Sequence, residues 1–262
     1  MKKNAPRVAM LRKKGETVDE LLDRRVKILQ KEKGYRFSVD ALLLAHFVRV
    51  KKGDLIADLG TGSGVIAIIV AQRKECCQAV GVDIQEELVD MARRSVMLND
   101  LQVKISIRHG DVRKIESLFK PESFDVSILN PPYRKVSSGK LNPDAEKSVA
   151  RHEIKGSLRD FLKASQYLLK KSGRVYIIYP ATRMVGLLSS MRTAGMEPKR
   201  MRIVHSHYSS RGEFVLVEGV KNGREELEIL PPLTVYSENG QYTEAMNAVF
   251  RELSCFPKAS AE

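Results

Sequence analysis

Residues 124–133 read FDVSILNPPY, an apolar run of strand length that ends in an amide, two prolines and an aromatic ring. Consecutive prolines donate no backbone hydrogen bonds and hold the chain extended, so the strand has to end at Leu129. We therefore expect the side chain of Asn130, the proline carbonyls and the ring of Tyr133 to lie at the carboxyl edge of a sheet. Open α/β sheets bind their ligands at that edge.

Residues 58–64 read DLGTGSG and place an acid and a glycine loop between a strand and a helix. Glycine permits positive φ, and the first turn of a helix leaves N–H groups free for an anion. A second acid, Asp83, ends the next strand, where a carboxylate can accept hydrogen bonds from ribose hydroxyls. A nicotinamide site shares these features. However, its GxGxxG spacing differs from glycines at 60, 62 and 64, and it gives no account of Asn130 and the prolines.

Strand and helix patterns alternate through the middle of the chain. Strands are predicted at 55–58, 79–82, 105–109, 126–129 and 174–179, and helices at 65–73, 86–98, 157–170 and 182–194. Such alternation is typical of an α/β fold with a doubly wound parallel sheet. Near the end, strands at 199–205 and 213–220 are joined by a link too short for a parallel crossover. We expect a Rossmann-like sheet of seven strands, six of them parallel and one antiparallel.

A third acid, Asp111, follows the third predicted strand, where it could meet the amino group of an adenine. Asp58, Asp83 and Asp111 thus end three successive strands, and Asn130 ends the fourth. Each acid alone is more often a helix cap than a ligand contact. The ordered set is what indicates a binding site along one sheet edge.

The charge of the chain is strongly basic. Its 262 residues suit one domain, and 45 Lys and Arg against 32 Asp and Glu give a net charge of +13. An excess of this size favours a polyanionic partner such as nucleic acid. Residues 1–36 carry twelve basic and five acidic side chains, so we expect a basic N-terminal leader with a weak helical or hairpin signal. With 6% aromatic residues, a platform that stacks many bases is not expected.

Composition also bears on the compartment. No apolar stretch approaches the roughly 18 residues of a membrane span, and no apolar run follows the basic N-terminus as in a signal peptide. The cysteines form no disulfide framework, and neither Cys76 and Cys77 nor His205 and His207 have the spacing of a metal site. We expect a cytoplasmic protein with no metal and no membrane partner.

Residues 134–155 are polar, lack an apolar period and are long for a connection in a compact domain. Loops of this length commonly bind ligands. Because the stretch carries several Lys and Arg, we expect it to be a substrate loop that contacts phosphates.

The motifs at 58–64, 82–83, 110–111 and 130–133 together resemble class I methyltransferases that use S-adenosylmethionine and modify amino or amide nitrogens. The resemblance implies that the glycine loop holds the methionine moiety of the cofactor, Asp83 the ribose and Asp111 the adenine. The implied cofactor residues are Asp58, Gly60, Thr61, Gly62, Gly64, Asp83, Ile84, Asp111 and Val112. The implied catalytic residues are Asn130, Pro131, Pro132 and Tyr133, with acceptors for the target NH₂ and a ring that stacks on it.

A narrower resemblance covers nearly the whole chain. GYRFSVDALLL at 34–44 is similar to the segment before the first strand in bacterial tRNA(Val) adenine-N6 methyltransferases, and 230–246 is similar to their tail. We expect a buried helix at 38–47 with a Ser or Asp cap. In that family the segment covers the cofactor, which adds Phe37, Ser38 and Asp40 as candidates. The resemblance implies a methyltransferase domain over 37–262 that acts on the N6 atom of an adenine near the anticodon of a tRNA.

Several alternatives stay open. Methyltransferases of the protein glutamine side chain share the Asn-Pro-Pro-Tyr motif, but they usually carry a helical domain before the glycine loop, whereas here a short basic segment precedes Asp58. Enzymes of guanine N2 or of DNA adenine N6 are further variants. A non-catalytic RNA-binding protein on the same scaffold is disfavoured by the intact Asp83 and Asn130. The sequence does not indicate the oligomeric state.

Overall fold

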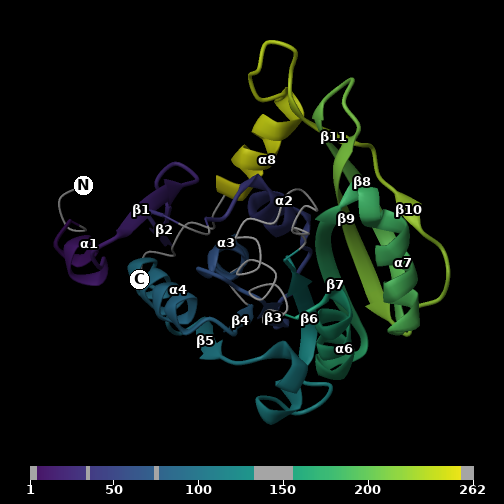
Figure 1. Cartoon of the computed structure of the whole chain (residues 1–262), viewed down its shortest axis with the longest axis horizontal. Helices are drawn as coiled ribbons and strands as arrows, with labels where there is room; N and C mark the ends of the chain where they lie inside the picture. The colour runs from purple at the N-terminus through teal and green to yellow at the C-terminus, as the bar shows by residue number, and fades with distance from the viewer. Residues whose placement is uncertain (1–4, 34–35, 74–76, 133–155, 255–262) are drawn as a thin grey trace, which may run out of the picture.

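The central element is a nine-stranded sheet (Figure 1). The structure is a computed structural model that describes residues 5–33, 36–73, 77–132 and 156–254. Tyr133 and the expected substrate loop lie outside the described residues. The strand order is β10-β8-β9-β7-β6-β3-β4-β5, and β11 also pairs with β8.

Six long strands run parallel and one runs against them, which confirms the predicted sheet. The parallel strands are β3 (Leu55–Leu59), β4 (Gln78–Asp83), β5 (Ile105–His109), β6 (Phe124–Leu129), β7 (Leu169–Pro180) and β8 (Met196–His207). The antiparallel strand is β9 (Gly212–Lys221), which lies between β7 and β8. Two short strands not predicted from the sequence, β10 (Glu228–Ile229) and β11 (Leu233–Tyr236), extend the sheet beside β8.

Helices cover both faces of the sheet (Figure 1). One face packs against α2 (Val39–Phe47), α3 (Val65–Arg73), α4 (Glu86–Leu98) and α8 (Glu244–Ser254). The other packs against the 3₁₀ helix η1 (Val112–Ser117), α6 (Leu158–Leu168) and α7 (Met184–Thr193), which follows the short η2 (Ala181–Arg183). Alternate strand residues serve the two layers, since Ile128 joins the first cluster and Leu129 the second. No helix of the described residues could span a membrane.

The N-terminal segment forms a helix, α1 (Ala5–Leu11), and a hairpin of β1 (Glu16–Leu21) and β2 (Val26–Lys31). The hairpin lies beside α4, at the edge of the molecule opposite β10 (Figure 1). Arg94 of α4 forms a bidentate ion pair with Glu16 at 2.6 Å. The Asn99 amide exchanges two hydrogen bonds with the Lys27 backbone. Side chains of α4 therefore hold this basic segment against the sheet domain.

Candidate active site

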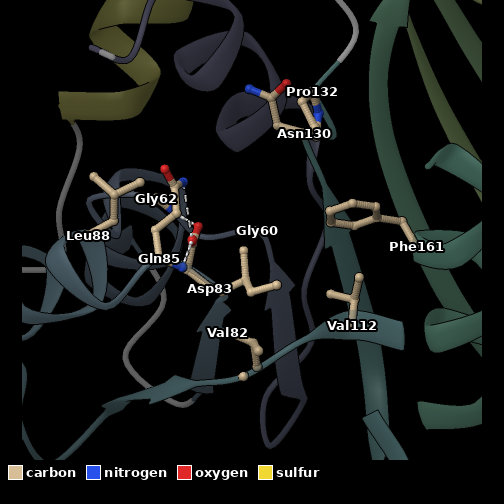
Figure 2. A pocket seen from close by; sticks show the side chains of 12 residues that line it. Gly60, Gly62, Val82, Asp83, Gln85, Leu88, Val112, Asn130, Pro132 and Phe161 are labelled. Atoms are coloured by element: carbon tan, nitrogen blue, oxygen red, sulfur yellow. Dashed lines mark hydrogen bonds between the residues drawn. The ribbon is translucent and has the colours of Figure 1, made fainter. Parts of the chain in front are cut away.

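A pocket that is partly open to solvent lies where β3, β4 and β6 end (Figure 2). Its lining comes from the loops that follow these strands and β5, and from α4 and α6. The lining residues are Gly60, Gly62, Val82, Asp83, Ile84, Gln85, Leu88, Gly110, Val112, Asn130, Pro132 and Phe161. The position agrees with the rule that open α/β sheets bind ligands at the carboxyl edge.

The glycine loop forms the floor of the pocket. Gly60, Gly62 and Gly64 all have positive φ, between 57° and 84°. The positive φ of Gly60 favours glycine, and a Cβ there would also lie a tight 3.1 Å from the ring of Phe161. The Gly60 and Thr61 amides donate to the Val82 carbonyl, which ties the loop to the end of β4.

Asp83 connects this loop to the start of α4. It is 6% exposed, and its two carboxylate oxygens accept hydrogen bonds from the backbone amides of Gly62 and Gln85, both at 2.9 Å (Figure 2). A carboxylate has about four lone-pair sites, so it keeps capacity to accept from ligand hydroxyls. Asp83 both shapes the loop and lines the pocket.

Asp58 lies behind the loop and is 1% exposed. Its Oδ2 accepts a hydrogen bond from the Thr61 hydroxyl at 2.7 Å, whereas Oδ1 accepts no hydrogen bond of good geometry from the described residues, although the Ala67 amide is near the carboxylate. Burial raises the pKa of Asp58 to about 6 and nearby Asp83 adds to the rise, although the Thr61 hydroxyl and the Ala67 amide oppose it. A buried acid with an unused oxygen is a ready acceptor for a cationic group.

Asn130 and Pro132 form the opposite side of the pocket, at the end of β6 (Figure 2). Pro131 is buried between them and does not line the pocket. The side-chain amide of Asn130 donates to Asp40 Oδ2 at 3.1 Å. This contact joins the end of β6 to the first turn of α2.

Asp111 has a different environment from the other two acids. It does not line the pocket, although its neighbours Gly110 and Val112 do. Its carboxylate caps η1 and forms a bidentate ion pair with Arg113 at 2.6–2.9 Å. The guanidinium of Arg113 holds the pKa of Asp111 below its ordinary value. An adenine contact by this side chain stays a prediction.

The three candidate residues before the first strand of the sheet do not line the pocket. Phe37 packs against the apolar core beside α2, and Ser38 and Asp40 lie at the start of that helix, outside the pocket lining. Ser38 is the N-cap residue of α2, as expected from a Ser or Asp cap, but its hydroxyl donates to Asp40 Oδ1 and accepts no backbone N–H. The carboxylate takes the role of the local acceptor instead, at the Ala41 amide.

Five lining residues were not candidates from the sequence: Val82, Gln85, Leu88, Gly110 and Phe161. Val82, Gln85 and Gly110 are next to predicted site residues in the chain, so the placement of ligand sites at strand ends could have identified them. Leu88 lies in the first turn of α4. Phe161 belongs to the helix predicted at 157–170, and no local signal marks its contact with Gly60.

The residues present fit S-adenosylmethionine. Asp83 has acceptor capacity for ribose hydroxyls, and Ile84 and Val112 offer apolar walls for a purine ring. Asp58, Thr61 and Gly64 do not line the pocket, but the unpartnered buried oxygen of Asp58 suits the ammonium group of the cofactor. Among the described residues, no three His, Cys, Asp or Glu side chains are grouped as metal ligands.

The chain is similar to known methyltransferases. Residues 38–191 match the family described as Methyltransferase small domain. A tRNA1(Val) (adenine(37)-N6)-methyltransferase of Dyadobacter fermentans is 25% identical over 215 residues, 81% of this chain and 87% of the relative. A protein of the same name from Bacteroides thetaiotaomicron is 30% identical over 186 residues, 64% of this chain and 75% of the relative.

A solved structure shows the shared fold. The crystal structure of a predicted O-methyltransferase from Agrobacterium tumefaciens has a TM-score of 0.67 at 21% identity, over 83% of this chain and 98% of that one. The family match covers more than half of the chain and includes the glycine loop, Asp83 and Asn130. The chain therefore belongs to the methyltransferase small domain family, in the group of the bacterial tRNA1(Val) (adenine(37)-N6)-methyltransferases.

Proposed function

We propose that this protein transfers a methyl group from S-adenosylmethionine to the N6 atom of an adenine in tRNA, at the anticodon-loop position 37 that its relatives' names specify. One observation carries the proposal. Asn130 and Pro132 line the same pocket as Gly60, Gly62 and Asp83, so acceptors for an amino group lie beside a nucleotide-type site.

The chemistry asked of the chain is mainly positioning. The amino group of adenine is a poor nucleophile, because its lone pair is delocalised into the ring. Acceptors on Asn130 and on a proline carbonyl favour a pyramidal nitrogen and aim its lone pair, which can contribute several kcal/mol to barrier lowering. When bound, the cofactor supplies an electrophilic methyl group on a sulfonium. No general base is needed, since the methylated amino group loses its proton readily.

The net charge of +13 supports a polyanionic substrate and, with tRNA, a cytoplasmic site of action. Extruding a base costs a few kcal/mol, and less in a loop than in a duplex. Binding of tRNA should weaken steeply with salt, with a log–log slope of roughly −0.7 per phosphate neutralised on a single strand. A flat salt response in a titration would contradict a basic binding surface.

The decisive experiment uses methyl-labelled S-adenosylmethionine with total tRNA, genomic DNA and a protein fraction. After digestion, the label should appear as N6-methyladenosine from tRNA. Label in N2-methylguanosine, in DNA adenine or in a protein glutamine identifies one of the related activities instead. A folded protein that binds the cofactor and labels none of the fractions is a non-catalytic binding protein. Cofactor binding is measured separately by calorimetry.

A further inference from the structure

The geometry points to Asp40 as a positioning residue. We propose that its carboxylate accepts a hydrogen bond from the Asn130 side-chain nitrogen and so leaves the amide oxygen facing the amino group that is to be methylated. The inference rests on the proposed function, because it concerns how the same site holds an amino group. It concerns a contact between positions 90 residues apart in the chain.

The contact has an ordinary hydrogen-bond length and is partly buried. Asn130 Nδ2 lies 3.1 Å from Asp40 Oδ2, and Asp40 is 6% exposed. In Figure 2 the amide oxygen of Asn130 lies on the side of Pro132, and the nitrogen lies on the opposite side. Asn130 lines the pocket and Asp40 does not, so Asp40 acts behind the residue that meets the ligand.

Chemistry fixes which end of the amide faces the carboxylate. A side-chain amide has one donor end and one acceptor end, and turning it by 180° exchanges them with little change in shape. A carboxylate offers acceptors only. An amide oxygen facing Asp40 would oppose two acceptors in a buried place, so the NH₂ end has to face it. The oxygen then lies away from Asp40, on the side of Pro132 (Figure 2), where we propose that it accepts from the target amino group.

Asp40 is itself held in place by its own helix. Its Oδ1 accepts from the Ala41 amide at 2.9 Å and from the Ser38 hydroxyl. These bonds orient the carboxylate so that Oδ2 is presented to Asn130. The hydrogen bond from the Ser38 hydroxyl to Asp40 thus helps to orient the carboxylate that contacts Asn130.

Substitution by asparagine separates this role from a structural one. In Asp40→Asn, the single amide oxygen at position 40 stays with the two donors from Ala41 and Ser38, and its NH₂ faces Asn130. The Asn130 amide then turns over and presents its own NH₂ to the pocket. If the correct orientation falls to about 1% of the population, kcat falls about 100-fold. In Asp40→Ala the amide has no orienting partner and populates both orientations, so kcat falls only a few-fold, about twofold from the populations alone.

We therefore expect a lower kcat for Asp40→Asn than for Asp40→Ala. If Asp40 served only in packing or in a cofactor contact, the alanine variant would have the lower kcat. Cofactor affinity should stay within about threefold of the parent in both variants. The double variant Asp40→Asn with Asn130→Asp restores a carboxylate–amide pair, with an acceptor at position 130. It should recover at least about tenfold over Asp40→Asn, and it carries the test if Asp40→Asn alone does not fold.

Asp54 supplies a matched control. It is another buried acid, 8% exposed and paired with Arg174, but it lies before β3 at the opposite edge of the sheet. Asp54→Asn should lower the melting temperature and leave kcat within about threefold. An Asp40→Asn variant at least as active as Asp40→Ala, a double variant without recovery, or a cofactor affinity that falls in step with kcat each overturns the proposal.

A readout without turnover separates this inference from the proposed function. The Asn130 side-chain NH₂ resonances, assigned by their absence in Asn130→Ala, should show a downfield, slowly exchanging proton that Asp40→Ala removes. If that signal is present and the parent enzyme methylates no tRNA, the proposed function fails and the orientation stands. If the parent is active and Asp40→Ala leaves the resonances unchanged, the orientation fails alone.

Discussion

Two buried acids lie behind the lining of the pocket, one on each side, and their hydrogen bonds differ. On the cofactor side, Asp58 is 1% exposed and keeps one oxygen without a partner among the described residues. On the acceptor side, the side of Asn130 where the target amino group is proposed to bind, Asp40 is 6% exposed. Both of its oxygens accept hydrogen bonds from protein donors. Burial is nearly the same, so the hydrogen-bond partners decide the role. An acid with an unused oxygen can meet a ligand, whereas one held by the protein can only orient its neighbour.

The two sides also differ in how the chain builds them. Asp58, Thr61 and the three glycines come from one loop of seven residues, and Asp83 reaches that loop from the adjacent strand. The acceptor side joins Asn130 at the end of β6 to the start of α2, far away in sequence. Variants that change one side should therefore leave the other intact.

The largest effect is expected on the acceptor side. Asn130→Ala removes the acceptor for the target amino group and should lower kcat by about 10³-fold, in the range seen when one preorganised polar group is lost. Cofactor affinity should be unchanged, because the glycine loop and Asp83 do not depend on this side chain. Single-turnover methylation and calorimetry measure the two quantities. Near-normal turnover in this variant would remove Asn130 from the mechanism.

On the cofactor side, Asp83→Ala should weaken S-adenosylmethionine binding about 100-fold. Each hydrogen bond to a charged group is worth about 1.5–3 kcal/mol, and the variant also frees the Gly62 amide that shapes the loop. Turnover at saturating cofactor should fall much less than in Asn130→Ala. Asp83→Asn is the control, since it keeps one acceptor for the loop. Equal affinities of Asp83→Ala and the parent protein would contradict the ribose role.

The fold follows closely from local pattern. The predicted helix 86–98 and strand 105–109 have the observed bounds, because each has the period of its element over its full length. The strand before Asn130 ends where the two prolines stop it. Seven residues singled out from strand ends line the pocket: Gly60, Gly62, Asp83, Ile84, Val112, Asn130 and Pro132.

Contacts between distant segments could not be predicted in this way. The N-terminal segment gives only a weak hairpin signal, because Glu16 and the β2 backbone are held by Arg94 and Ser95 of α4 and by Asn99 at its C-terminal end. The contact of Asp40 with Asn130 could not be predicted either, because no helix or strand periodicity relates positions 90 residues apart. Side-chain partners of this kind depend on tertiary packing, which a local pattern does not encode.

A smaller effect tests the unused oxygen of Asp58. Its pKa of about 6 is raised above the ordinary value, so the carboxyl takes up a proton and loses its charge as the pH falls through 6. Affinity for the cationic cofactor should then fall about tenfold between pH 7 and pH 5, because about one molecule in ten stays ionised at pH 5. Asp58→Asn should bind weakly and without this pH dependence. A parent affinity that is constant over this range would mean that Asp58 does not face the ammonium group.

The smallest effect is expected at Asp111, the acid that the protein has already paired. Its carboxylate is bonded to Arg113 and does not line the pocket, so a contact with adenine has to compete with that ion pair. Asp111→Asn should weaken cofactor binding only about threefold, since an exposed ion pair contributes little and the amide can still accept a hydrogen bond. Arg113→Ala provides the counterpart: by releasing the carboxylate it should strengthen binding slightly. If Asp111→Asn instead costs as much affinity as Asp83→Ala, the ion pair opens when the cofactor binds, and the third strand end contributes as fully as the second.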